Sequence, residues 1–366
     1  MANFLEQLPQ HLQEIAERVN VRTPEAVLTT PKIKFLDTRT CPLDTCVHSC
    51  TPEDVRILKD AAAKWLAETP VSADSLFRPP ACLKWSRLTF GCAALDSCTG
   101  GGIVTRGITE ICGVSGVGKT QLLLQLSLGV QLPPRLGGLG KGVAFICTED
   151  MFPSRRLLQI SKAFEARYPD EQLNFLGNIF IEHQYETVSQ PAQSCIFKAK
   201  YTFLQKPLLD CVNNRLPQLL QDHSIGLIII DSVAAIFRLY SDFGERSRDM
   251  RRMVNALLTY ADKYQCAVVC TNQMTAASLR QDDQSQQQAV QDVPCLGVQW
   301  ANLGRTRMRI CKVPKQHRVD DQLLTVRKLE IMYSPETPNA FAEFLITAEG
   351  VVDVPQPSLR KPKKQL

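Results

Sequence analysis

The sequence lacks a long hydrophobic run. No stretch of its 366 residues approaches the roughly 18 consecutive apolar residues that a membrane-spanning helix needs. Residues 1–20 also lack the basic end and the apolar block of a secretory signal, because acidic and polar residues stand there instead. From these two absences we expect a protein without membrane contact that stays inside the cell.

A strong charge of either sign is absent as well. The 42 Lys and Arg residues against 37 Asp and Glu residues leave a net charge of +5, which permits a nucleic-acid partner without arguing for one. The composition, 44% hydrophobic and 22% charged, is ordinary for a globular chain, and an internal repeat is missing. At about 150 residues per domain, the length favours two domains.

Cysteine, by contrast, is abundant, with 14 residues. Most of them lie in apolar stretches, where a free thiol behaves as a small hydrophobe, so the pattern indicates a reducing compartment. Four possible soft metal ligands occur close together: Cys41, Cys46, His48 and Cys50. Their spacing matches no zinc pattern, so an ordinary loop is the expectation and a metal site is the alternative.

Residues 1–67 predict a small all-helical domain. Apolar residues recur at gaps of three and four from Leu5 to Val19, which is the spacing of one helical face. Thr23-Pro24-Glu25 and Thr51-Pro52-Glu53 each place a capping hydroxyl before a proline at the first helical position. In the second of these helices we expect the following residues to face inward: Val55, Leu58, Ala62, Trp65 and Leu66.

Residues 68–85 contain three prolines and no periodicity, and predict a linker. In residues 86–352, short apolar runs alternate with helical patterns, which is typical of an α/β domain with a doubly wound, mostly parallel sheet. The expected strands are Ile108–Cys112, Val143–Cys147, Ile179–Glu182, Leu227–Asp231, Cys266–Thr271, Arg307–Val313, Val326–Met332 and Phe341–Ile346. Residues 353–366 have no core-forming pattern and predict a disordered basic tail.

The strongest motif is a complete GxxxxGK[ST] loop between an expected buried strand and an expected leucine-rich helix. Its residues are Gly113, Val114, Ser115, Gly116, Val117, Gly118, Lys119 and Thr120. Backbone amides and a helix N-terminus converge on phosphate in such a loop, and glycines leave room for the anion. We expect Lys119 to reach the β and γ phosphates of a nucleoside triphosphate and Thr120 to bind Mg²⁺.

Three polar residues follow other expected strands. Asp231 ends the apolar run from Leu227 and is the candidate second ligand for Mg²⁺, although it is alternatively only a strand cap. Since Ser232 comes next, the base that activates water must lie elsewhere, and Glu149, just past Val143–Cys147, is the candidate. Gln273 is a possible sensor of the γ phosphate, and on its own it would be an ordinary polar residue after a strand.

Together these residues resemble the RecA-like recombinases, in their eukaryotic Rad51 branch, over about residues 86–352. Finer features resemble a Rad51 paralogue, and they are Cys147-Thr148-Glu149-Asp150, Asp231-Ser232-Val233-Ala234-Ala235, Ile181-Glu182-His183 and Leu296-Gly297-Val298-Gln299-Trp300-Ala301-Asn302. The resemblance implies a RecA-like P-loop ATPase core that binds ATP and Mg²⁺, with Arg156 stacked on the adenine. It also implies contacts to single-stranded and junction DNA through a first loop that begins at Arg238 and includes Arg246 and Arg248.

The resemblance further implies a role and partners. Members of this group act in homologous recombination, so we expect a subunit of a heteromeric complex that repairs double-strand breaks and crosslinks and assists recombinase filament assembly and junction processing. The implied partners are the C-type Rad51 paralogue, as a heterodimer, and the Rad51 recombinase. The implied location is the nucleus with a cytoplasmic pool, and the implied turnover is at most a weak, DNA-stimulated ATPase.

The sequence departs from the recombinase pattern at several positions. No glycine precedes Gly91, so the helix-hairpin-helix amides that bind DNA phosphate are not expected in the N-terminal domain. Phe77-Arg78-Pro79-Pro80-Ala81 replaces the Phe and Ala that join protomers, and Tyr333 replaces the Asp before Ser-Pro that caps a neighbour's ATP. Residues 188–206 are longer than this segment usually is, and are either a surface insertion or a DNA or partner patch.

The two candidate DNA loops differ in charge. Residues 238–252 hold five arginines against three acidic residues, a balance of +2, whereas residues 276–293 hold Arg280 against three aspartates, a balance of −2. Only the first loop is therefore expected to meet phosphate, and part of its arginine set is alternatively a solvated helix face. Two rival functions remain open: a self-filamenting strand-exchange ATPase, and an interaction scaffold whose ATP site is purely structural.

Overall fold

The computed structural model describes residues 4–36, 50–67, 85–149, 151–184, 207–276, 292–319 and 321–355. The chain divides into two compact units, Met1–Leu83 and Lys84–Leu366. Several predictions fall wholly or mostly outside the described residues: the ligands Cys41, Cys46 and His48, the 68–85 linker, the 188–206 segment, the 276–293 loop and the tail. Within the described residues, no helix combines the length and the hydropathy required to cross a membrane.

The first unit is helical, as the sequence predicts. Its elements are η1 (Leu5–Gln7), α1 (Gln10–Arg18), α2 (Pro24–Thr29), α3 (Lys32–Leu36) and α4 (Pro52–Leu66). Both predicted caps form: the Thr23 hydroxyl accepts a hydrogen bond from the Ala26 amide at 3.2 Å, and Thr51 makes a capping box with Asp54. Leu12, Val27, Phe35 and Leu58 are fully or almost fully buried and form the centre of a small core.

The prediction that the last turn of α4 faces inward is wrong. Val55, Leu58 and Ala62 are buried, but Trp65 and Leu66 are 40% and 39% exposed. Both residues stand in the last turn of α4, and neither belongs to the small core. The Trp65 ring instead packs edge-on against Phe4, with 5.6 Å between ring centroids.

The second unit contains a large mixed sheet and a two-stranded sheet made of β1 (Arg87–Leu88) and β2 (Ile103–Val104). The strands of the large sheet are β3 (Ile108–Gly113), β4 (Gly142–Cys147), β5 (Ile179–His183), β6 (Ile225–Asp231), β7 (Ala267–Ala276), β8 (Asp292–Pro294), β9 (Thr306–Val319), β10 (Gln322–Tyr333), β11 (Phe341–Thr347) and β12 (Gly350–Asp353). Their order is β12-β11-β10-β9-β3-β7-β6-β4-β5, with β8 paired to β7. In this order, each strand from β9 to β5 is parallel to its neighbour. Each strand from β12 to β9 is antiparallel to its neighbour.

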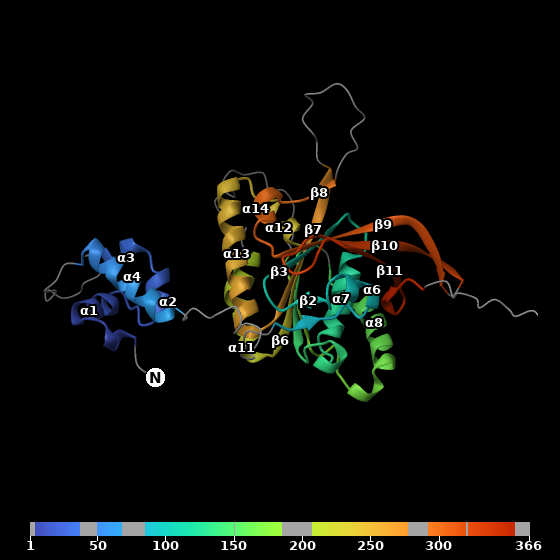
Figure 1. The fold of residues 1–366 in the computed structure, drawn as a ribbon, viewed down its shortest axis with the longest axis horizontal. Coiled ribbons are helices and arrows are strands. Elements are labelled where there is room, and N and C mark those ends of the chain that lie inside the picture. Colours follow the sequence, from blue (N-terminus) through green and yellow to red (C-terminus); the bar gives the residue numbers. More distant parts are fainter. Residues whose placement is uncertain are drawn as a thin grey trace, which may run out of the picture. The chain divides into compact units, whose positions relative to one another are not determined.

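Helices cover both faces of this sheet (Figure 1). They are α6 (Ala93–Cys98), α7 (Lys119–Gly129), η4 (Pro134–Leu136), α8 (Ser154–Arg167), η5 (Pro169–Glu171), α10 (Pro207–Asp210), the π-helix η7 (Cys211–Arg215), α11 (Leu216–Asp222), α12 (Val233–Phe237), α13 (Phe243–Tyr264) and α14 (Gly297–Ala301). Alternate residues of β6 enter two cores: Leu227 and Ile229 pack in the core that includes α7 and α8, and Ile228 and Ile230 in the core that includes α11 and α13.

This arrangement confirms the predicted α/β class with a mostly parallel sheet, and each predicted strand overlaps a strand of the structure. The short strands β1, β2, β8 and β12 were not predicted from the sequence. For function, the register matters most: Gly113 of β3 lies beside Gln273 of β7, and Cys147 of β4 lies beside Asp231 of β6. The carboxyl ends of four neighbouring parallel strands therefore meet at one edge, where doubly wound sheets bind ligands.

Candidate functional site

The GxxxxGK[ST] segment forms a tight loop between β3 and α7. Two of its glycines are constrained for different reasons. A Cβ on Gly113 would lie 2.7 Å from the backbone carbonyl oxygen of Ile310, whereas a Cβ on Gly118 would meet only the movable end of the Ile346 side chain, at 2.5 Å. Gly118 also has a φ of +111°, which non-glycine residues rarely adopt. The loop opens directly into the first turn of α7, so its amides and the helix N-terminus face the same space.

Lys119 lies across this loop. Its Nζ donates hydrogen bonds to the carbonyl oxygens of Gly113 and Val114, at 2.8 and 3.1 Å. Burial lowers the pKa of Lys119, and the carboxylates of Asp231 and Glu149 oppose that shift. The ammonium group therefore interacts with backbone carbonyls and nearby acids, and an anion in the loop can accept the same N–H bonds.

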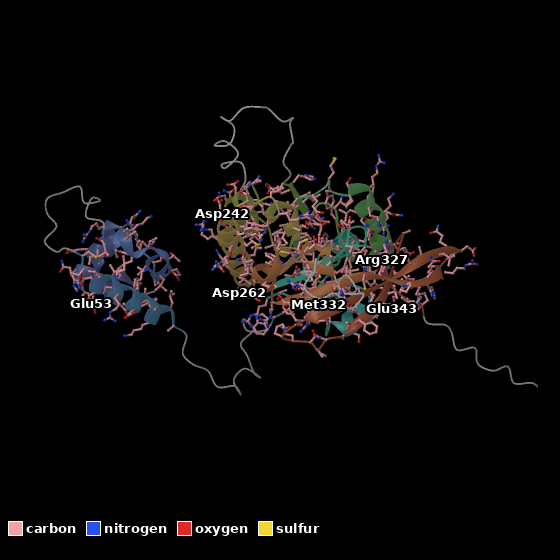
Figure 2. The ribbon with its side chains drawn as sticks, turned by 90° about the horizontal axis from the view of Figure 1, so that it is seen from above. Glu53, Asp242, Asp262, Arg327, Met332 and Glu343 are labelled. Carbon is pink, nitrogen blue, oxygen red and sulfur yellow. The ribbon has the colours of Figure 1, made fainter. Side chains whose placement is uncertain are left out.

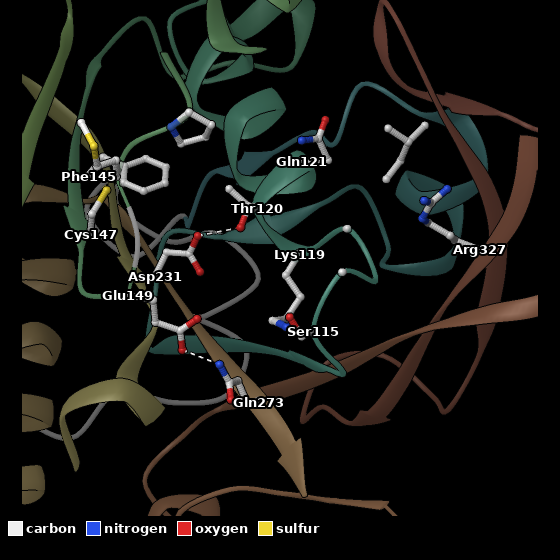
Figure 3. Close-up of a pocket in the computed structure, with 15 residues that line it drawn as sticks. Ser115, Lys119, Thr120, Gln121, Phe145, Cys147, Glu149, Asp231, Gln273 and Arg327 are labelled. Atoms are coloured by element: carbon white, nitrogen blue, oxygen red, sulfur yellow. Dashed lines mark hydrogen bonds between the residues drawn. The ribbon is translucent and has the colours of Figure 1, made fainter. Parts of the chain in front are cut away.

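Asp231 ends β6 and faces the start of α7. Its Oδ2 accepts a hydrogen bond from the Thr120 hydroxyl at 2.8 Å (Figure 3). Its Oδ1 accepts one from the Thr271 hydroxyl at 2.5 Å. Burial raises the pKa of Asp231, although the two hydroxyl donors act in the opposite direction. The structure thus brings together the two residues that the sequence predicted as Mg²⁺ ligands.

The donor set at Thr120 and Asp231 suits Mg²⁺. A hydroxyl and a carboxylate are hard oxygen ligands, and Mg²⁺ in nucleotide sites is held by one or two such groups together with water and phosphate oxygens. Among the described residues, no group of three or more His, Cys, Asp or Glu side chains is placed to hold a metal ion by itself. A metal at this position therefore depends on a bound phosphate for its remaining ligands.

Glu149 lies at the end of β4 and joins the neighbouring strands. Its Oε1 accepts a hydrogen bond from Gln273 Nε2 at 2.7 Å (Figure 3). The same oxygen accepts one from the Ser232 hydroxyl at 2.5 Å. The predicted base and the predicted γ-phosphate sensor are therefore in direct contact. Ser232 orients the base through its hydrogen bond, whereas from the sequence it indicated only that a second acid is missing after Asp231. Its hydroxyl group was the one sequence feature that could have suggested this role.

These residues surround one pocket of about 530 Å³, a size typical of small-ligand sites. Its lining includes Ser115, Gly116, Gly118, Lys119, Thr120, Glu149, Asp231 and Gln273. Arg327 of β10, which was not predicted from the sequence, also lines the pocket and donates from Nε to the Val117 carbonyl oxygen at 2.9 Å. Burial lowers the pKa of Arg327. No local sequence pattern distinguished this arginine from its neighbours, because only the folded sheet brings it close to the loop.

Arg156 lies in the first turn of α8, beside Gln121, which lines the same pocket. Its guanidinium donates to Gln121 Oε1 at 2.6 Å and to the carbonyl oxygens of Thr347 and Ala348 at 2.6 and 2.8 Å. Burial lowers the pKa of Arg156. This network fixes the plane of the guanidinium next to the pocket, and stacking on an adenine stays a prediction.

The arginines predicted to contact DNA lie just after α12 and in α13. Arg238 follows α12, is exposed, and donates from Nε to the Ala234 carbonyl oxygen at 3.1 Å. Arg246 and Arg248 lie in the first turns of α13, where Arg246 is half-buried and Arg248 is exposed. Residues 277–291 of the second candidate loop, with Arg280, lie outside the described residues.

We expect Glu149→Gln to leave nucleotide affinity unchanged and to lower any ATP turnover by at least about 100-fold. Glutamine keeps the length of the side chain and an Oε1 acceptor for Ser232 and Gln273, but it does not take a proton from water. Paired measurements of ATP-analogue binding and phosphate release test this, and unchanged hydrolysis would assign the base to another residue.

Comparison with known proteins agrees with this geometry. The sequence model of the Rad51 family matches residues 83–354. The DNA repair protein XRCC3 of Bos taurus is 37% identical over 281 residues, which cover 74% of this chain and 75% of that protein. XRCC3 of Mus musculus is 32% identical over 325 residues, covering 82% and 86%, and the XRCC3 homolog of Arabidopsis thaliana is 33% identical over 302 residues, covering 73% and 93%. The resemblance to a Rad51 paralogue, most like XRCC3, is confirmed.

Proposed function

Since the chain belongs to the Rad51 family, we propose that it acts in homologous recombination as an ATP-binding and DNA-binding subunit of a heteromeric complex. In this role it assists assembly of the recombinase filament and processing of junctions during the repair of double-strand breaks and crosslinks. The names of its relatives, which are DNA repair proteins, support this role. The proposal includes a nuclear location with a cytoplasmic pool.

One observation carries the ATP-binding part of the proposal. At a single sheet edge, the phosphate-binding loop, the Thr120–Asp231 pair and the Glu149–Gln273 pair surround the same pocket of about 530 Å³. The loop amides and Lys119 would hold the β and γ phosphates, and Thr120 and Asp231 would hold Mg²⁺, which neutralises phosphate charge. Glu149 would then orient and deprotonate water, while Gln273 would report on the γ phosphate through its contact with Glu149.

The DNA-binding part of the proposal is supported by the charge of the segment from Arg238 to Arg252. Five arginines there face three acidic residues, and one of the acids, Asp249, is buried and hydrogen-bonded to Tyr240. Asp249 also forms an ion pair with Arg252 at 3.2 Å, so four arginines remain against Asp242 and Glu245, a balance that is still +2. Cations placed in this way release counterions from a nucleic-acid backbone, so the affinity should fall with salt.

A partner subunit is supported by the free edge of the sheet. In the described residues β5 pairs only with β4, and a pocket of about 480 Å³ lies beside it between the strand and α11. Phe180, Leu216 and Leu219 line the apolar part of this pocket, and Arg215 forms an ion pair with Glu182 in its wall. An extended linker segment of a related subunit, such as the C-type Rad51 paralogue, would pair with this edge and insert an apolar side chain.

Self-assembly has less support than a heteromer. Tyr333 stands where the recombinases have the Asp that caps a neighbour's ATP. Its hydroxyl lies 2.7 and 3.2 Å from the carbonyl oxygens of Ala301 and Gly304 of the same chain, to which it donates. We therefore expect the purified chain to stay monomeric or in short species with ATP and single-stranded DNA, and to form a stable heterodimer when the C-type paralogue is added. Electron microscopy and size-exclusion chromatography test this, and long filaments of the chain alone would refute it.

A further inference from the structure

Arg327 of β10, labelled in Figure 2, is a cation of the pocket wall without an acidic partner. Its side chain is half-buried, and it donates to two backbone carbonyl oxygens, from Nε to Val117 at 2.9 Å and from Nη1 to Thr325 at 3.1 Å. Within the described part of the chain, its Nη2 group donates no hydrogen bond and the guanidinium forms no ion pair. A cation that has lost part of its water is destabilising unless a negative charge compensates it.

The neighbouring cations of the same antiparallel strands do have acidic partners. Arg309 of β9 pairs with Glu330 at 2.5 Å, and Lys315 of β9 pairs with Glu343 at 2.8 Å. Arg327 departs from this pattern, although it is the one of these three that lines the pocket. The missing negative charge is therefore specific to the pocket wall, where a ligand can supply it.

The residue opposite Arg327 on β9 is a second cation. The strand register pairs Arg327 with Lys312, which is exposed and forms no ion pair with a described residue. Side chains directly opposite each other in an antiparallel pair lie on the same face, and like charges there repel. This arrangement costs stability in the free protein, so it is explained by an anion that binds beside it.

The position of Arg327 in the pocket indicates which part of a nucleotide it meets. Figure 3 shows Arg327 and Glu149 on opposite sides of Lys119. In the proposed function the γ phosphate lies at the Glu149 end, so the phosphate chain continues past Lys119 and its α phosphate comes to the side of Arg327. The guanidinium is adjacent to the loop itself, since its Nε would lie 3.3 Å from a Cβ on Gly118.

We propose that Arg327 binds the α phosphate of the nucleotide and, together with Lys119, sets the affinity of the pocket. The inference rests on the proposed ATP-binding function and deepens it. A guanidinium presents its N–H groups in a planar fork that fits two phosphate oxygens, so one phosphate satisfies both the charge and the unused Nη2 group. Because ATP and ADP share the α phosphate, the contact contributes equally to both.

The test titrates the full chain with fluorescent analogues of ATP and ADP in the presence of Mg²⁺. The variant is Arg327→Gln, because the amide nitrogen of glutamine stands as far along the side chain as Nε of arginine and can keep the bond to the Val117 carbonyl oxygen. We expect the affinity for both analogues to fall at least about tenfold and by similar factors, as loss of a charge-assisted hydrogen bond does. Arg327→Lys should lose less, since it keeps the charge without the fork.

Lys312→Gln is the matched control, because it removes the same charge from the residue directly opposite, which does not line the pocket. It should bind both analogues as the wild type does. Chemical denaturation separates binding from a structural role. Without nucleotide, Arg327→Gln should be at least as stable as the wild type, because the substitution relieves the repulsion from Lys312, and it should gain less stability from added ADP.

Three results would overturn the inference while leaving the proposed function intact. They are an unchanged affinity of Arg327→Gln for both analogues, a loss confined to ATP, and a lower stability of this variant without nucleotide, which would assign the arginine a structural role. If the wild type binds neither analogue, the ATP-binding part of the proposed function fails and the inference fails with it.

Discussion

Lys119→Ala is expected to abolish measurable ATP binding without unfolding the second unit. The substitution removes the one ammonium group that lies across the phosphate-binding loop, and each charge-assisted hydrogen bond to phosphate contributes roughly 1.5–3 kcal/mol. A fall in affinity of at least about 100-fold follows. The fold should persist, because Lys119 lines the pocket and its ammonium group donates to the Gly113 and Val114 carbonyl oxygens of the loop.

The measurement is titration of a fluorescent ATP analogue in the presence of Mg²⁺, with circular dichroism to check folding. Lys141→Ala is a suitable control, since Lys141 Nζ also donates to a backbone carbonyl oxygen, that of Tyr264, at 2.9 Å, outside the pocket lining. The control should bind the analogue as the wild type does. Equal binding by wild type and Lys119→Ala would show that the loop does not hold the phosphates.

Arg307→Ala is expected to lower the free energy of unfolding of the second unit by about 3–5 kcal/mol, because it leaves the Glu110 carboxylate buried without its cation. Arg307 Nε donates to Glu110 Oε2 at 2.6 Å, and the two side chains are 11% and 1% exposed. Asn272 Nδ2 donates to the other oxygen of Glu110 at 2.7 Å, so one donor would remain. These three side chains connect β9, β3 and β7, and Asn272 is the residue before Gln273 in β7.

Arg309→Ala provides the comparison for this prediction. Arg309 lies two residues along the same strand and pairs with Glu330 at 2.5 Å, but its side chain is 33% exposed. Solvent screens such a pair, so its removal should cost only about 0–1 kcal/mol. Chemical denaturation of the three proteins measures the differences, and equal stabilities of the two variants would contradict the role assigned to the buried pair.

Much of the site could be predicted because its residues stand at the ends of recognisable strands. The loop from Gly113 to Thr120 is contiguous, and a local pattern is enough to identify it. Asp231 and Glu149 follow apolar runs that are long enough to be buried parallel strands, and such strands end at a common edge. The caps at Thr23 and Thr51 were likewise predictable, since capping depends on residues only three positions apart.

The parts that sequence did not predict depend on contacts between distant segments. Arg327 reaches the phosphate-binding loop from 210 positions away, and Arg307 reaches Glu110 from 197. Periodicity shows only that such a residue lies on a strand, not which neighbour the strand will have. Trp65 and Leu66 were assigned to the core for a related reason, since helical spacing gives the direction of a side chain but not the extent of the core that covers it.

Affinity purification of the full chain from cells under native conditions shows whether the chain is an ATP-binding subunit of a heteromeric recombination complex, as we propose. We expect a second Rad51-family subunit, the C-type paralogue, to be recovered in equal amount, and ATP to be bound to the complex of the wild type but not to that of Lys119→Ala. Recovery of the chain alone, or of long assemblies of the chain with itself, would refute the proposal.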